Sequence, residues 1–262
     1  MTSDAVRINI SGSVMTLTLD APEIRNALTA EIEAGLVRGI EAAASSDVRA
    51  VVLTGNGAAF CAGASTKELG ANDEKDLASL RARARVIPDT ILQPLVRLEK
   101  PVIAAVNGWA VGAGIGVALA CDFRLGSDST RFLFGFRRLA LVPDLGIAWF
   151  LPRLIGYRAA RDLLFADRQL DAAAALEVGL LDELVPQEDL LPRADALARE
   201  LASGPTLALG LMKRMLHTSS ETNLGSFLEE ETLVQTMLVR ASDHQEGVDA
   251  LAARRPPDFR GC

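Results

Sequence analysis

The sequence predicts an α/β core with a mainly parallel sheet, followed by a helical C-terminal third. Residues 50–54 (AVVLT) and Val102–Val106 are bare apolar runs, which are typical of strands covered on both faces. A glycine-containing loop follows each run, and segments of helical periodicity separate them. Strands and helices that alternate in this way imply right-handed crossovers. Beyond Ile155, leucines at helical spacing replace the apolar runs.

The first elements are predicted from short patterns. Residues 6–10 and Val14–Leu19 are β-like runs around Ser11-Gly12-Ser13, which favours a hairpin. After Pro22, apolar residues spaced four apart indicate a helix. These residues are Ile32, Leu36, Ile40 and Ala44.

The middle and end of the chain are predicted in the same way. Residues 76–98 have a helical period that breaks near Pro88. A glycine- and alanine-rich helix is expected at 112–120, and a strand at 122–125. Helices are then expected around Leu163 and Ala174 and at 190–201, 207–216 and 224–239, with one short strand at Leu184-Val185.

Composition excludes several classes of protein. At 262 residues, 49% of them hydrophobic, the chain can bury a sizeable core. The net charge of −7 argues against a basic nucleic-acid-binding face. No apolar run reaches the roughly 18 residues that a membrane-spanning helix needs, so no membrane partner is expected.

Cysteine and histidine usage argues against disulfides and metals. Cys61, Cys121 and Cys262 show neither a pairing pattern nor metal-ligand spacing, so a cytoplasmic location is expected. HExxH and CxxC are absent, and no metal site is expected. The two histidines, His217 and His244, are expected on solvated helix surfaces.

Two loops carry the main functional signal. Residues 60–64 (FCAGA) and 112–116 (GAGIG) each follow an apolar strand, where ligands of α/β sheets bind. Their small side chains would let a ligand atom approach the main chain. Two inward N–H groups there would form an oxyanion hole. Close helix–sheet packing is the alternative explanation. A dinucleotide site is disfavoured because the second loop lacks GxGxxG spacing.

Six segments resemble the enoyl-CoA hydratase/isomerase (crotonase) superfamily and follow its order along the chain. They are APEIRNALT (21–29), VVLTGNGAAFCAGASTKEL (51–69), KPVIAAVNGWAVGAGIGVALACDFRLGS (100–127), LVPDLGIAWFLPRLIG (141–156), ALEVGLLDELVP (175–186) and EGVDALAARRPPDF (246–259). The resemblance implies a crotonase-like spiral of ββα units over residues 1–200. It also implies a helical trimerisation region at 201–262 that packs on the core and on a neighbouring subunit of a homotrimer or hexamer.

The resemblance also implies a reaction. An acyl-CoA thioester would be held by the N–H groups of Ala64 and Ala113. Family hydratases use two glutamates, whose positions here are Gly116 and Phe136. Asp144, in a VPD sequence, resembles the residue of members that shift double bonds. The expected enzyme is therefore an enoyl-CoA isomerase of fatty acid metabolism, with Asp144 as proton shuttle. Beside it an apolar wall is expected from Phe132, Phe134, Phe136 and Trp149.

Three alternatives stay open. A Pro-Asp pair before an apolar helix is also an ordinary helix start, so Asp144 could be an N-cap. The chain could be a hydratase (lyase) with an atypical water site, or a non-catalytic acyl-CoA-binding protein. Dehalogenation by an aspartate nucleophile, known in the superfamily, is disfavoured because it needs a histidine base and residues 1–216 contain none.

Coenzyme A is anionic, so local cations matter more than net charge. The resemblance places Arg25, Lys67 and Arg254 near its phosphates, the last from a neighbouring subunit. Each could instead be a solvated surface cation, and so could Arg81, Arg83 and Arg85. The remaining binding residues implied by the resemblance are Ala62, Gly63, Gly112, Gly114 and Phe136. No cofactor is expected beyond the coenzyme A of the substrate.

Overall fold

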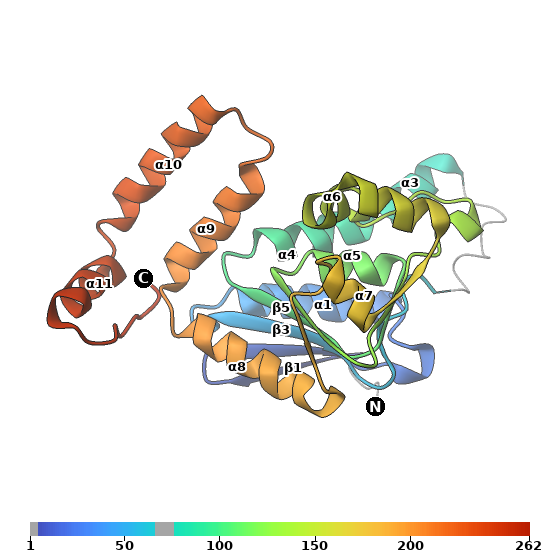
Figure 1. Cartoon of the computed structure of the whole chain (residues 1–262), viewed down its shortest axis with the longest axis horizontal. Helices are drawn as coiled ribbons and strands as arrows, with labels where there is room; N and C mark the ends of the chain where they lie inside the picture. The colour runs from blue at the N-terminus through green and yellow to red at the C-terminus, as the bar shows by residue number, and fades with distance from the viewer. Residues whose placement is uncertain (1–4, 66–75) are drawn as a thin grey trace.

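The computed structural model describes residues 5–65 and 76–262 (Figure 1). Within these residues the strands form two sheets. The larger sheet has the order β1 (Val6–Ser11), β2 (Val14–Leu19), β3 (Ala50–Gly55), β5 (Val102–Val106), β7 (Phe123–Ser127), β10 (Glu183–Val185). The smaller has the order β4 (Ala59–Cys61), β6 (Trp109–Val111), β8 (Arg131–Leu133), β9 (Gln169–Asp171). The predicted hairpin β1–β2 and the predicted parallel pairing of the other strands of the larger sheet are confirmed.

Helices fill the connections between these strands. Those before β7 are η1 (Pro22–Ile24), α1 (Ala30–Ala43), α3 (Leu77–Ile87), η2 (Pro88–Leu92), α4 (Gln93–Arg97) and α5 (Ala113–Leu119). The later ones are η3 (Arg137–Leu139), α6 (Ile147–Ala166), α7 (Ala172–Glu177), η4 (Gln187–Asp189), α8 (Leu190–Ala202), α9 (Thr206–Thr218), α10 (Leu224–Leu238) and α11 (Ser242–Ala253). The predicted break near Pro88 is a π-helical turn, η2.

The larger sheet is covered on both faces, as its bare apolar strands predict. Because side chains alternate along a strand, Val51 and Leu53 of β3 join one core cluster and Val52 joins the other. Residues of α1 and α4 belong to the first cluster. The second cluster is closed by α8, which packs against β3 and β5.

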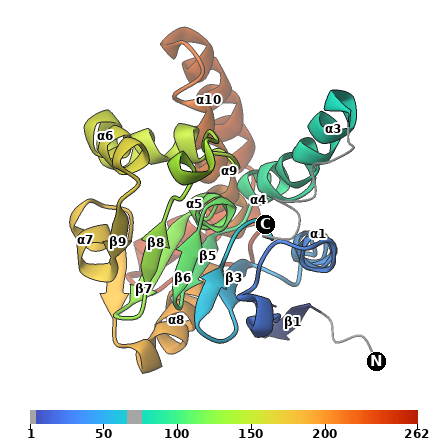
Figure 2. The same cartoon turned by 90° about the vertical axis from the view of Figure 1, so that its right-hand side faces the viewer.

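The core repeats one unit along the chain. A strand of the larger sheet is followed by a strand of the smaller sheet, in the pairs β3–β4, β5–β6 and β7–β8, and α5 or α6 follows the later two pairs. Figure 2 shows β6 and β8 side by side, with α5 above them. The strands of the smaller sheet are three residues each, too short to show periodicity, and the sequence analysis did not predict them.

The chain ends in a helical region, as predicted. Helices α9, α10 and α11 extend away from the sheets (Figure 1). Arg49 ties the end of the chain to the core. Its guanidinium donates to Thr206 Oγ1 at 2.8 Å, the Phe259 carbonyl at 3.0 Å and the Gly204 carbonyl at 2.6 Å. Among the helices of residues 5–65 and 76–262, none combines the length and apolarity needed to cross a bilayer.

Candidate active site

The two glycine-containing loops meet in space. They follow β4 and β6, which are parallel neighbours, so their carboxyl ends lie at the same edge of the smaller sheet. Gly63 has a φ of +74° and faces the start of α5. A Cβ atom added at Gly63 would lie 3.1 Å from the Ala113 nitrogen and 3.4 Å from the Gly114 nitrogen. Because the Val111 carbonyl oxygen would lie only 2.5 Å from that Cβ, only glycine lets the two loops approach each other this closely.

The backbone of both loops leaves donors available. Leu28 N–H donates to the Gly63 carbonyl, and the Ala62 N–H donates to the Arg25 carbonyl, which fixes the first loop against residues 25–28. Gly112, with a φ of +49°, precedes α5, and its N–H donates to the Leu133 carbonyl. Within residues 5–65 and 76–262, the Ala64 and Ala113 N–H groups donate to no protein acceptor. Such donors suit a developing oxyanion.

Two buried asparagines, neither of them predicted from the sequence, hold the segment from Gly55 to Phe60 that leads into the first loop. Asn26, fully buried with a φ of 55°, donates to the Ala59 carbonyl at 2.8 Å and accepts from the Ala21 N–H at 2.9 Å. Asn107 accepts from the Gly55 N–H at 3.1 Å and donates to the Gly57 carbonyl at 2.9 Å. An asparagine directly after a bare apolar strand, as Asn107 is, was the available signal.

Asn26→Ala is expected to lower the free energy of unfolding by about 3 kcal/mol, because it leaves several buried main-chain groups without partners. Urea denaturation of both proteins measures this. Asn9→Ala, at an exposed position in β1, is the matched control and should change stability by less than about 0.5 kcal/mol. Equal stability of Asn26→Ala and the wild type would show that Asn26 does not hold the loop.

Asp144 lies in the turn before α6, beside α5. The N-cap alternative is wrong, because the cap residue is Gly146 and no side chain caps this helix. The Asp144 carbonyl, not its carboxylate, accepts from the Ile147 N–H at 3.0 Å. Asp144 is exposed at the surface of the single chain, yet desolvation by the protein around it raises the pKa of its carboxyl, against a smaller opposing effect of its own N–H. A carboxyl group with a raised pKa suits proton transfer.

The two positions of the hydratase glutamates are occupied differently. Gly116 is buried, and a Cβ there would lie 2.5 Å from Leu145 Cβ and 2.7 Å from the Leu145 carbonyl oxygen. Phe136 is 8% exposed, and its ring end would lie 3.9 Å from a Cβ at Gly112. Phe136 thus borders the second loop. Its segment is anchored by Asp167, whose carboxylate accepts from the Gly135 N–H at 2.7 Å and pairs with Arg138.

The predicted cations are spread over the structure. Arg25 is exposed beside the first loop, in the left-handed region at φ 54°. Lys67 lies outside the described residues. Arg254 is exposed at the end of α11, in the projecting helical region (Figure 1). Arg83 lies on the exposed helix α3, as expected, and its guanidinium also contacts both oxygens of the buried Glu33 carboxylate, at 2.8 and 3.1 Å.

His217 was expected on a solvated helix surface, and this prediction is wrong because the residue is half-buried. Its ring stacks on Trp149, with centroids 6.4 Å apart, and desolvation lowers its pKa. Both rings line a cavity of about 630 Å³ that runs from Leu92 past Gly146 to Glu221. Burial raises the pKa of the Cys61 thiol to about 12, so it does not supply a thiolate nucleophile at neutral pH.

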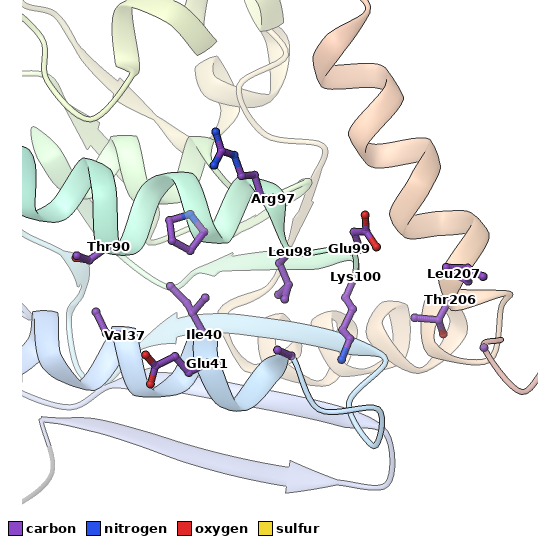
Figure 3. Close-up of a pocket in the computed structure, with 13 residues that line it drawn as sticks. Val37, Ile40, Glu41, Thr90, Arg97, Leu98, Glu99, Lys100, Thr206 and Leu207 are labelled. Carbon is purple, nitrogen blue, oxygen red and sulfur yellow. The ribbon is translucent and has the colours of Figure 1, made fainter. Parts of the chain in front are cut away.

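A separate cavity of about 750 Å³ lies between α1, α4 and the start of α9 (Figure 3). Ile40, Leu98 and Leu207 contribute apolar lining. The charged lining residues are Glu41, Arg97, Glu99 and Lys100. It shares no lining residue with the two loops or with the Asp144 turn. The candidate site is therefore defined by the loops and not by this cavity.

The sequence model of the family described as enoyl-CoA hydratase/isomerase matches residues 9–262. The chain belongs to the enoyl-CoA hydratase/isomerase family. The superfamily membership predicted from the six segments is thereby confirmed, and the chain is an enzyme of this family.

Relatives within the enoyl-CoA hydratase/isomerase family differ in reaction. The chain is 36% identical to 1,2-epoxyphenylacetyl-CoA isomerase of Escherichia coli, over 97% of each chain. It is 36% identical to 2,3-dehydroadipyl-CoA hydratase of the same organism, over 95% of each. The crystal structure of an enoyl-CoA hydratase/isomerase from Cupriavidus metallidurans superposes with a TM-score of 0.93 at 31% identity, covering 100% of this chain and 98% of the other. The predicted crotonase-like fold is confirmed.

Proposed function

We propose that this enzyme is a double-bond isomerase of acyl-CoA thioesters, in which Asp144 carries the proton and the Ala64 and Ala113 N–H groups hold the thioester oxygen. One observation carries the proposal. Leu145 packs against Gly116, one helical turn after Ala113, so the turn that carries Asp144 lies against the short helix that begins at Ala113. Donors for an enolate and one proton-transferring group are what such an isomerisation needs.

The chemistry follows from these groups. The Asp144 carboxylate takes a proton from C2 of a 3-enoyl-CoA, and the electron pair moves into the thioester to form a dienolate. The two N–H groups stabilise the negative oxygen of this dienolate. The protonated Asp144 then returns the proton to C4, which yields the 2-enoyl-CoA and the starting carboxylate. The buried ring of Phe136 keeps the wall apolar and limits access of water.

The proposal is tested by incubating the wild type with a 3-enoyl-CoA and separating the products by liquid chromatography. The expected product is the 2-enoyl-CoA. Recovery of unchanged substrate together with tight acyl-CoA binding would instead support the non-catalytic alternative.

A dependence on pH is predicted from the raised pKa of Asp144. Because the carboxylate form takes the first proton, kcat/KM for isomerisation should fall as pH drops through this pKa and stay level above it. The acidic limb should therefore lie above the range of an ordinary aspartate. A pH–rate profile from about pH 4 to about pH 9 measures it. A profile that is flat across this range, or one that rises toward acid, would contradict the assignment.

Hydration is the second candidate, since the 2,3-dehydroadipyl-CoA hydratase is as similar to this chain as the isomerase is. It would need a water site other than the two-glutamate one, because Gly116 and Phe136 supply no carboxylate. Formation of a 3-hydroxyacyl-CoA from a 2-enoyl-CoA would establish it.

Coenzyme A binding and assembly complete the proposal. The nucleotide would be held by main chain at Ala62, Gly63, Gly112 and Gly114 and by the cations Arg25, Lys67 and Arg254. The last of these would act across an interface in a homotrimer or hexamer. Exposed apolar side chains on the C-terminal helices support such an interface. They include Leu216, Leu224, Leu233, Met237 and Leu251.

A further inference from the structure

The contact between Gly116 and Leu145 is closer than any side chain at position 116 would allow. A Cβ there would lie 2.5 Å from Leu145 Cβ, 2.7 Å from its carbonyl oxygen and 3.3 Å from its carbonyl carbon. Ordinary carbon–carbon contacts are about 3.5 to 4.0 Å. Two of the three atoms belong to the Leu145 backbone, so a rotamer change cannot relieve the contact. The chain at 145 would have to move.

Leu145 is held in an uncommon conformation at this contact. Its φ of 42° is in the left-handed region, where a γ-branched side chain without a local polar group is rarely found. The residue is 6% exposed and belongs to the main core cluster. Strain of this kind persists only where surrounding packing determines the backbone, and such sites are often functional. Helix α5 supplies part of this packing through Gly116, and Leu145 lies two residues before α6 begins.

Asp144 is the residue directly before this locked position. Its carbonyl accepts from the Ile147 N–H, and the Gly146 carbonyl accepts from Trp149 and Phe150, so the turn from 144 to 147 is tied to the start of α6. Because both ends of the turn are fixed, the position of the Asp144 Cα depends on how closely the Leu145 backbone approaches Gly116. Gly116 lies on the same short helix as Ala113, whose N–H group belongs to the proposed oxyanion hole.

We propose that Gly116 and Leu145 are positioning residues for Asp144, and that their backbone contact commits the site to one-carboxylate chemistry. The site then requires glycine at position 116, because any larger residue would displace Leu145. Leu145 fills the space that the Cβ of a glutamate at position 116 would occupy, and in this proposal Leu145 positions the Asp144 carboxylate relative to the oxyanion donors. This inference rests on the proposed function, because it explains how the same site is restricted to proton shuttling.

Gly116→Ala is the direct test. A contact of 2.5 Å must open to roughly 3.5 Å, so Leu145 and Asp144 should move by about 1 Å. A misplacement of this size can cost about 100-fold in rate, so kcat for isomerisation of a 3-enoyl-CoA should fall about 100-fold. The KM should change less than about threefold, because the first loop and the Ala113 donor stay in place. No hydration of a 2-enoyl-CoA should appear.

Two further variants separate positioning from general destabilisation. Gly39→Ala adds a methyl group in α1 at 2.7 Å from a Leu17 methyl, and it should lower the melting temperature without changing kcat. Leu145→Gly removes the nearest contact and permits the positive φ. In the Gly116→Ala background it should restore kcat at least about fivefold, although alone it lowers kcat because the turn is less restrained. Absence of rescue, or an equal loss of kcat in Gly39→Ala, would overturn the proposal.

A crystal structure of Gly116→Ala gives a readout that does not depend on activity. If the wild type does not isomerise 3-enoyl-CoA but Asp144 shifts in the variant, the proposed function fails and the positioning contact stands. If the wild type isomerises and the variant keeps both kcat and the Asp144 position, the function stands and the positioning inference fails. Should Gly116→Ala not fold, Leu145→Gly alone decides, and an unchanged kcat there would overturn the inference.

Discussion

Asp144→Asn is expected to lower kcat for isomerisation of a 3-enoyl-CoA by about 100- to 10,000-fold, the range that one general acid–base group contributes. Asparagine keeps the shape of the side chain but cannot accept the C2 proton. The KM should change little, because the loops that hold the thioester are untouched. Initial rates under saturating substrate, followed by the appearance of the conjugated product, give this measurement.

The same variant should not be less stable than the wild type at neutral pH. The raised pKa of Asp144 means that its ionised form is disfavoured in the folded chain, so this carboxyl contributes stability below its unfolded pKa and loses it as pH rises through its folded pKa. Asparagine carries no such charge. Asp128→Asn, at an exposed turn position, is the control and should keep full activity. A similar loss in both variants, or a kcat for Asp144→Asn within threefold of wild type, would remove Asp144 from the mechanism.

Gly63→Ala is expected to reduce kcat/KM by about 100- to 1000-fold, the cost of losing one oxyanion-hole donor. The new methyl group would lie 3.1 Å from the Ala113 nitrogen and 2.5 Å from the Val111 carbonyl oxygen. It would therefore push the two loops apart and shift the Ala113 donor relative to the Ala64 donor. Steady-state kinetics on a short-chain 3-enoyl-CoA gives the rate, and isothermal titration calorimetry with a saturated acyl-CoA gives binding.

A second variant separates the backbone strain of alanine at positive φ from the displacement of the loops in Gly63→Ala. Gly179 has a φ of +81° with no heavy atom within 4 Å of an added Cβ. Gly179→Ala therefore introduces the same backbone strain, about 1 to 2 kcal/mol, without filling any space. It should lower stability and leave kcat/KM unchanged. If the two alanine variants lose activity equally, strain and not the donor explains the effect of Gly63→Ala.

Much of the fold could be predicted from local pattern. The strands β3 and β5 were evident because each is a bare apolar run, and the structure covers both faces of the sheet that contains them. The helix break at Pro88 was evident because proline lacks an N–H group. The smaller sheet was not predictable, because β4, β6, β8 and β9 are three residues long and their pairing depends on contacts distant in sequence.

Some features of the candidate site could be predicted from the sequence, and others could not. The two loops were identifiable because small residues after strands permit close approach of a ligand, and the family resemblance pointed to Ala64 and Ala113 within them. The hydrogen bonds of the Asn26 side chain could not be predicted, since their acceptors are the carbonyls of residues 56, 59 and 60, about thirty residues away. The close approach of Leu145 to Gly116 was equally hidden, because a positive φ at leucine is imposed by tertiary packing and has no local sequence signal.

The central claim is that one carboxylate moves a proton within an acyl-CoA held by two main-chain donors. The most direct measurement is the ultraviolet absorbance of the conjugated enoyl-thioester, with a 3-enoyl-CoA in one cuvette and a 2-enoyl-CoA in the other. We expect a rise with the 3-enoyl-CoA that Asp144→Asn abolishes, and no fall with the 2-enoyl-CoA beyond the small reversal set by the isomer equilibrium. A fall with the 2-enoyl-CoA that Asp144→Asn leaves unchanged would contradict the account and establish a hydratase with another water site.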